Sequence, residues 1–210
     1  MFGGTGEPCH DGIIPERPRM HFIHRSGLLN LIAIFGLSIL ICMPGFADDT
    51  TLISIGPRIG FTGKTPLMGK QQKHNFHLAD VAAVFRLPWS RPVGESPWNL
   101  ETRLITSVGS LAAVGEYGVM ATIVPCLALS GWDRLVSLDV GVGLGFFSRD
   151  NYGNQDFGGP VQIVATAGIV VNPIPHGYAG FRVQHFSDAG VYGPNSLGVY
   201  MYIVEAGYRF

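Results

Sequence analysis

The stretch that decides the fold reads Val136-Ser137-Leu138-Asp139-Val140-Gly141-Val142-Gly143-Leu144-Gly145-Phe146. Every second side chain in it is apolar, and the side chains between are Ser, Asp or Gly. Successive side chains of a β-strand point to opposite faces, so this alternation predicts a strand with one apolar face. The opposite face would carry only small or polar groups.

The same alternation recurs along the rest of the chain. With 134–147, the alternating segments are 51–63, 75–87, 98–110, 117–130, 160–171, about 177–188 and 198–210. They have roughly 11–15 residues each, whereas a typical strand of a soluble protein has about 5–6. Long alternating segments separated by turns are typical of a transmembrane β-barrel. We therefore predict an all-β fold, an eight-stranded antiparallel outer-membrane barrel whose interior is filled by side chains.

The composition supports a membrane protein rather than a cytosolic enzyme. Charged residues make up 14% of the chain, well below the roughly 25% of an average soluble domain. The net charge of −1 gives no reason to expect a nucleic-acid partner. Of the three cysteines, Cys9 and Cys42 lie in the N-terminal region that we expect to be absent from the mature protein. Cys126 then remains alone, which excludes an intramolecular disulfide framework and a cysteine-based metal site. We expect no metal and no cofactor.

The N-terminal region has the pattern of a secretory signal peptide. Residues 27–43 form the only long apolar run, Arg25 precedes it, and small residues end it at Ala47. The alternative is a transmembrane anchor, but the run is shorter than the ~20 residues that a spanning helix needs. We expect residues 1–47, an N-terminal extension plus signal peptide, to be removed, and residues 48–210 to form the barrel.

Charged side chains alternate onto the inward face of the predicted strands. Because buried charges need partners, we expect these groups to pair inside the closed barrel, where the many inward glycines leave them room. The cations are Arg58, Arg86, Arg103, Arg182 and Arg209, and the anions are Asp80, Glu101, Asp139 and Glu205.

The connections predict which end of the barrel faces outward. In bacterial outer-membrane barrels both termini are periplasmic and the longer loops are extracellular. We therefore expect four connections to be extracellular and three to be periplasmic. The extracellular ones are 64–74, 111–116, 148–159 and 188–197, and the periplasmic ones are 88–97, 131–133 and 172–176.

The last residue predicts a partner and a location. Phe210 ends an aromatic row on an amphipathic final segment and resembles the signal read by the outer-membrane assembly machinery. Together with the signal peptide, it predicts the outer membrane of a Gram-negative bacterium, with outer-membrane lipids around the barrel.

Residues 181–188 carry the candidate site. Alternation places His185 and Ser187 on the apolar outward face, while Arg182 and Gln184 point inward. Histidine is the usual base that activates a serine nucleophile. At the predicted extracellular end the pair faces the outer leaflet, which is lipopolysaccharide, so an acyl ester of lipid A is the expected substrate. The alternative is a chance His-x-Ser without chemistry.

A family resemblance adds to this reading. The segment 182–190, Pro194-Asn195, the terminal Gly-Tyr-Arg-Phe and the earlier 85–89 resemble the lipid A 3-O-deacylase (PagL), or acyloxyacyl hydrolase, family. The resemblance implies an eight-stranded barrel whose lipid-facing wall removes the 3-linked acyl chain of lipid A with a Ser/His/Glu triad. It implies Ser187 as nucleophile and His185 as general base, and it places Asn195 where it could donate to the oxyanion.

Two positions depart from the family pattern. Asp188 stands where the family commonly has Asn, and residues 196–200 contain no acid where the triad Glu is expected. Asp188 could orient His185 if the chain bends after Ser187. Two hypotheses therefore stay open. One is an outer-membrane serine esterase, and the other is a non-catalytic barrel, serving membrane integrity or adhesion, that has lost the triad acid.

Overall fold

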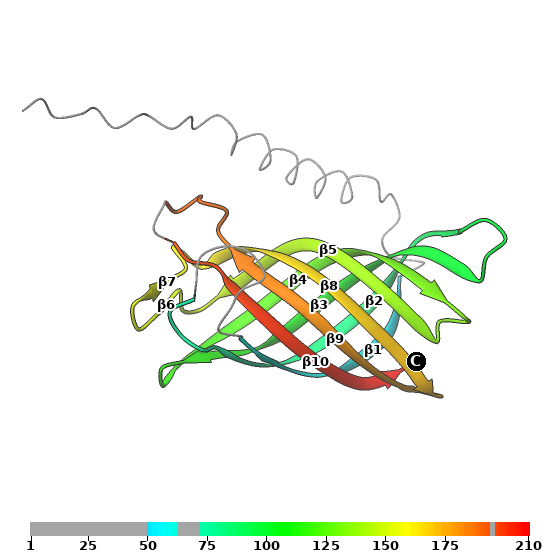
Figure 1. The fold of residues 1–210 in the computed structure, drawn as a ribbon, viewed down its shortest axis with the longest axis horizontal. Helices are drawn as coiled ribbons and strands as arrows, with labels where there is room; N and C mark the ends of the chain where they lie inside the picture. Colours follow the sequence, from blue (N-terminus) through cyan, green and yellow to red (C-terminus); the bar gives the residue numbers. More distant parts are fainter. Residues whose placement is uncertain (1–49, 63–71, 194–195) are drawn as a thin grey trace, which may run out of the picture.

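Eight long strands close into one antiparallel barrel (Figure 1). The computed structural model describes residues 50–62, 72–193 and 196–210. The strand order around the barrel is β1-β10-β9-β8-β5-β4-β3-β2, so the predicted eight-stranded all-β barrel is confirmed. The barrel strands are β1 (Thr51–Phe61), β2 (His77–Pro92), β3 (Trp98–Ala113), β4 (Glu116–Gly131), β5 (Val136–Phe147), β8 (Val161–Ile174), β9 (Gly177–Ser187) and β10 (Val199–Arg209).

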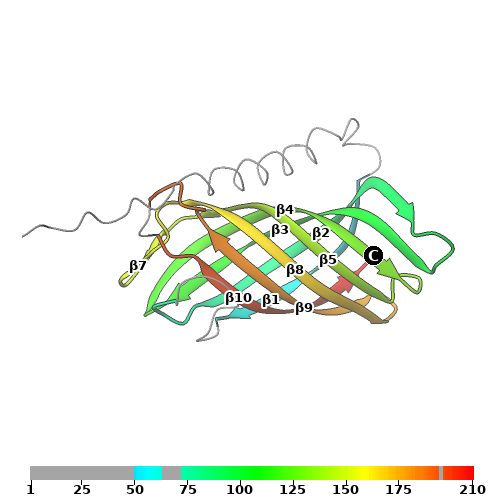
Figure 2. The same cartoon turned by 45° about the horizontal axis from the view of Figure 1, so that its top comes forward.

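One predicted periplasmic connection, 88–97, is half strand. β2 continues to Pro92 and so takes up the first half of the segment 88–97. Its pairing with β3 shifts register between Arg86 and Ser90, an irregularity of the kind that lets a strand accept a proline. The β2–β3 hairpin therefore projects beyond the other strands, at the end of the barrel that holds the C-terminus (Figures 1 and 2).

The predicted inward and outward faces are confirmed along the strands. Apolar side chains more than half exposed alternate with buried polar ones, as a barrel surrounded by lipid requires. No helix in the described part of the chain is long and apolar enough to cross a membrane. Examples of such adjacent pairs are Ile59 beside Arg58, Val108 beside Ser107, Val140 beside Asp139, and Val204 beside Glu205.

Two inward ion-pair groups fill the middle of the barrel. Arg58 forms a two-pronged pair with Asp80, with N–O distances of 2.8 and 2.5 Å. Arg182 binds Asp139 through both terminal nitrogens (2.5 and 3.1 Å) and also Glu205 (3.2 Å). All five side chains are buried. The expected pairing inside the barrel is confirmed for these groups.

A third inward group surrounds Glu101. Its carboxylate, fully buried, accepts hydrogen bonds from Arg103 and from the Ser130 hydroxyl (3.1 Å). Arg86 lies 3.6 Å from its second oxygen and Arg134 lies 3.8 Å from it. Arg134 was not among the predicted inward cations, because alternation places residue 134 on the outward face with Val136. It lies instead in the turn before β5.

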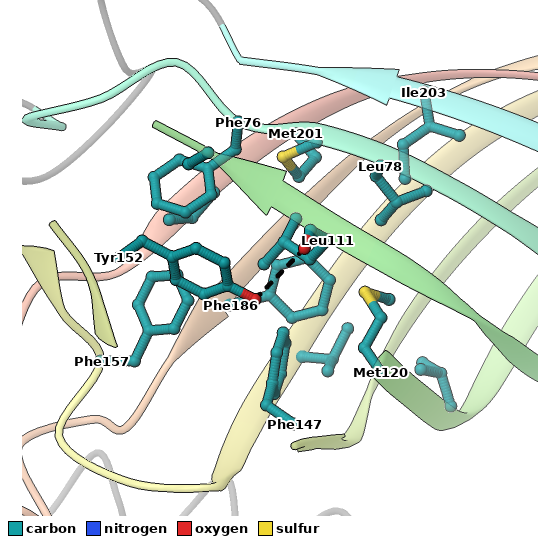
Figure 3. Packing of buried hydrophobic residues seen from close by; sticks show 14 of the residues in the cluster. Phe76, Leu78, Leu111, Met120, Phe147, Tyr152, Phe157, Phe186, Met201 and Ile203 are labelled. Atoms are coloured by element: carbon teal, nitrogen blue, oxygen red, sulfur yellow. Dashed lines mark hydrogen bonds between the residues drawn. The ribbon is translucent and has the colours of Figure 1, made fainter. Parts of the chain in front are cut away.

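An unpredicted hairpin covers one end of the barrel. It consists of β6 (Asn151–Tyr152) and β7 (Gln155–Asp156), in the connection from β5 to β8. We call this end, where β9 also finishes, the loop end. The Tyr152 hydroxyl donates to the Leu111 carbonyl (3.3 Å), and burial raises the pKa of Tyr152 to about 12. Packed aromatic rings fill the barrel below the hairpin (Figure 3), namely Phe76, Phe147, Tyr152, Phe157 and Phe186.

Candidate active site

His185 and Ser187 lie on the outward face of β9, next to the loop end. Both side chains are half-buried, while the alternating neighbours Arg182, Gln184 and Phe186 are buried inside the barrel. The two side chains therefore share the outward face of β9, as alternation predicts, while their catalytic role and the leaflet they face stay predictions.

Two inward side chains fix the position of β9. Arg182 is held by its carboxylate partners, and Phe186 packs edge-on against Phe147, with ring centroids 5.2 Å apart. A slip of one residue would turn both anchors toward lipid, so the register is strongly specified. The same register holds His185 and Ser187 on the outside.

His185 contacts β10 rather than an acid. It stands directly opposite Tyr200 in the β9–β10 pairing, and the two rings stack with centroids 4.1 Å apart at 25°. The Cε1–Nε2 edge of the imidazole lies over Gly198, where an added Cβ would sit 2.7 Å from Cε1. Nδ1 is buried and has no hydrogen-bond partner. No carboxylate oxygen of the described residues lies within 4.0 Å of either ring nitrogen.

The Ser187 hydroxyl is held by the turn that follows it. Its Oγ accepts a hydrogen bond from the Ala189 N–H (3.0 Å), and the described side chains include no Ser187–His185 hydrogen bond. Ala189 has a φ of 53°, in the left-handed region that favours glycine. Hydrogen bonds between catalytic groups are often long before substrate binds, so the pair remains geometrically able to meet.

Asp188 organises the loop instead of reaching His185. Its side chain is buried, and its two oxygens accept the N–H groups of Gly190 and Tyr192, each at 3.0 Å. The bend after Ser187 therefore directs this carboxylate to the loop backbone. Asn195, the predicted oxyanion donor, lies outside the described residues.

The β6–β7 hairpin supports the segment that approaches His185. The Gln155 side chain is fully buried and donates to the Gly198 carbonyl (3.5 Å), and the Leu197 N–H donates to the Asp156 carbonyl (2.9 Å). This link was missed from sequence. The Gly153-Asn154 pair between residues 152 and 155 is a two-residue turn signal that could have revealed the hairpin.

Within the described ranges, no group of three or more His, Cys, Asp or Glu side chains is placed to hold a metal ion. The described groups around Ser187 are the His185 imidazole, the Tyr200 ring and backbone groups of the following turn. These groups can support nucleophilic attack and proton transfer.

Comparisons with known proteins identify the family of the chain. A sequence model of the lipid A 3-O-deacylase (PagL) family matches residues 77–209, and no curated protein matches the chain. The crystal structure of the outer membrane enzyme PagL is 17% identical, with a TM-score of 0.57 over 73% of this chain and 97% of that one. The Yersinia pestis outer membrane protein Ail, in a phospholipid bilayer nanodisc, is 14% identical, with a TM-score of 0.41 over 75% and 99%. Because the family match spans more than half of the chain, this protein belongs to the lipid A 3-O-deacylase (PagL) family.

Proposed function

We propose that this protein is an outer-membrane serine esterase that hydrolyses the 3-linked acyl ester of lipid A. One observation carries the proposal. Within the segment that matches the deacylase family, β9 presents Ser187 and His185 together on the outward face. A nucleophile and a base on that wall can reach an ester that is itself part of the membrane.

The proposed reaction passes through an acyl-enzyme. Ser187 Oγ attacks the ester carbonyl carbon while His185 takes the hydroxyl proton. The tetrahedral intermediate expels the 3-oxygen of the sugar, which takes the proton from His185, and the acyl chain stays on Ser187. Water then attacks this ester, with His185 as base, and the fatty acid leaves.

The oxyanion needs hydrogen-bond donors beside the nucleophile. The Ala189 N–H lies 3.0 Å from Ser187 Oγ. We propose that it donates to the oxyanion that develops when the serine attacks. Asn195 is proposed as a second donor, on its family position alone. The Asp188 carboxylate is directed to the loop backbone, where it accepts hydrogen bonds from two N–H groups, and it is not proposed as an oxyanion donor.

The barrel fold supports a proposed setting in the outer membrane. The loop end would face outward, so that Ser187 and His185 lie at the depth of the outer leaflet of a Gram-negative outer membrane. Lipopolysaccharide is then both surrounding lipid and substrate. Phe210 is proposed as the contact of the assembly machinery, and residues 48–210 as the mature barrel.

A second candidate is a non-catalytic barrel that serves membrane integrity or adhesion. The observation that favours it is the lack of any carboxylate within 4.0 Å of His185 in the described ranges. Loss of the orienting acid of a serine triad lowers the rate by about 10⁴-fold. The first candidate therefore predicts slow turnover, and the second predicts none.

Lipid A analysis separates the two candidates. The full chain is expressed in a Gram-negative host without a deacylase of its own, and the mass of its lipid A is measured by mass spectrometry. We expect the loss of one 3-hydroxyacyl group, and we expect Ser187→Ala to abolish it. Heat-dependent gel mobility checks that both barrels are folded. An unchanged lipid A mass beside a folded barrel contradicts the esterase and supports the second candidate.

Asp188→Asn tests whether the acid next to the serine orients the base. Because its oxygens are bound by Gly190 and Tyr192, the substitution should change the deacylation rate by less than about tenfold, while an orienting acid would be worth about 10⁴-fold. The rate of lipid A deacylation by purified protein in detergent measures this. Asp188→Ala, which removes both acceptors, is the comparison for damage to the loop.

A further inference from the structure

Tyr200 occupies the position on β10 that directly faces the proposed base. The β9–β10 register pairs Tyr200 with His185, and the ring centroids are 4.1 Å apart. Stacked aromatic pairs in proteins usually have centroids about 4.5–7 Å apart. One face of the imidazole is therefore closely covered by the tyrosine ring.

The other contacts of His185 include a backbone hydrogen bond with Val199 but no hydrogen-bonded side chain. Nδ1 makes no hydrogen bond, and the described acids lie more than 4.0 Å from the ring nitrogens. Gly198 lies against the Cε1–Nε2 edge of the ring and restricts its movement only by steric contact. The Asp188 carboxylate is engaged by Gly190 and Tyr192. Of the described side chains around His185, Tyr200 is thus the one positioned to fix the plane of its ring.

We propose that Tyr200 is a positioning residue that takes the place of an orienting acid. The inference rests on the proposed function. When Ser187 passes its proton to His185, the resulting imidazolium lies over the face of the Tyr200 ring. An aromatic face attracts a cation through its quadrupole. The ring thereby orients the base and stabilises its charged form, and the phenol oxygen is not required.

The expected contribution is smaller than that of a carboxylate. Cation–π interactions of this kind correspond to about 2- to 30-fold in rate, compared with about 10⁴-fold for the acid of a triad. The site would therefore keep a working base at a reduced rate.

The test measures how fast Ser187 reacts, independently of lipid A. Folded full-length protein in detergent is treated with a long-chain alkyl fluorophosphonate. Ser187 Oγ forms a bond to phosphorus, the P–F bond breaks, fluoride leaves, and His185 takes the serine proton. Mass spectrometry gives the labelling rate, and kcat and KM for lipid A deacylation are measured in parallel.

Four variants separate the ring face from a structural role. Tyr200→Leu should lower the labelling rate and kcat about tenfold with little change in KM, and Tyr200→Phe should keep most of both because the ring face remains. Tyr202→Leu, one outward position further along β10 and opposite Val183, is the matched control and should label at the wild-type rate. Tyr200→Glu should label faster than wild type, because a carboxylate would then stand opposite His185.

Each outcome decides a specific claim. The inference is overturned if Tyr200→Leu labels at the wild-type rate, if Tyr200→Phe loses as much as Tyr200→Leu, or if Tyr200→Glu is no faster than Tyr200→Leu. A chain that labels as expected but leaves lipid A intact contradicts the proposed substrate and leaves the role of Tyr200 standing. A folded wild-type chain that does not label at all overturns both.

Discussion

Arg182→Leu will lower the free energy of unfolding of the barrel by about 3–5 kcal/mol. The guanidinium is buried, and it is the shared partner of Asp139 and Glu205. Removing it leaves two carboxylates inside the barrel without this partner, and an unpaired buried charge is strongly destabilising. Urea unfolding in lipid vesicles, followed by tryptophan fluorescence, measures the change.

Two controls distinguish the ion pairs from the loss of a large side chain. Arg91→Leu removes an exposed arginine of β2 and should change stability by less than about 0.5 kcal/mol. In the triple variant Arg182→Leu, Asp139→Leu and Glu205→Leu, no charge is left unpaired, so much of the loss should be recovered. If the single variant is as stable as wild type, the two carboxylates must be solvated, and the barrel interior must hold water at this depth.

The same guanidinium shows why glycines face the barrel interior. A Cβ on Gly168 would lie 2.9 Å from the Arg182 Cζ, and a Cβ on Gly180 would lie 2.9 Å from Glu205 Oε1. The ion pairs therefore need these positions to lack side chains. This agrees with the prediction that inward glycines leave room for the charges.

The fold could be predicted because successive residues of each strand face alternately the outside of the barrel and its interior. In 136–146 each apolar residue faces outward and each small or polar residue faces the barrel interior, so the sequence carries the signal at every position. The β6–β7 hairpin has strands of two residues and too little alternation for such a signal. The extension of β2 to Pro92 was hidden by its prolines, which usually end a strand.

The candidate site was only partly predictable for the same reason. Alternation places His185 and Ser187 on one face. It also places Tyr200 on the outward face of the next strand, but it leaves the register open in steps of two residues. Gly198, Tyr200 or Tyr202 could each have faced His185 until the β9–β10 pairing was known. The hydrogen bonds from the loop to Asp188 also could not be predicted, because they depend on the backbone conformation after Ser187.

Gly198→Ala will reduce deacylation about 100-fold while the barrel stays folded. An added Cβ would lie 2.6 Å from the Phe186 carbonyl oxygen and 2.7 Å from His185 Cε1. The backbone oxygen is part of the β9–β10 pairing and moves little, so both the backbone at residue 198 and the imidazole must shift. A base displaced by about 1 Å from its nucleophile can lose about 10²-fold in rate.

The kinetics of this variant separate positioning from stability. Overpacking at one site destabilises a protein by about 1–3 kcal/mol, so urea unfolding should show a moderate shift, while the fluorophosphonate labelling rate of Ser187 falls in step with kcat. Gly94→Ala is the matched control for labelling. Nothing lies within 4 Å of its added Cβ, and its φ of 59° makes alanine there destabilising as well, but it lies in the β2–β3 hairpin at the opposite end of the barrel. Wild-type labelling by Gly198→Ala would mean that His185 reaches Ser187 from another rotamer. The stack on Tyr200 would then not be the working position of the base.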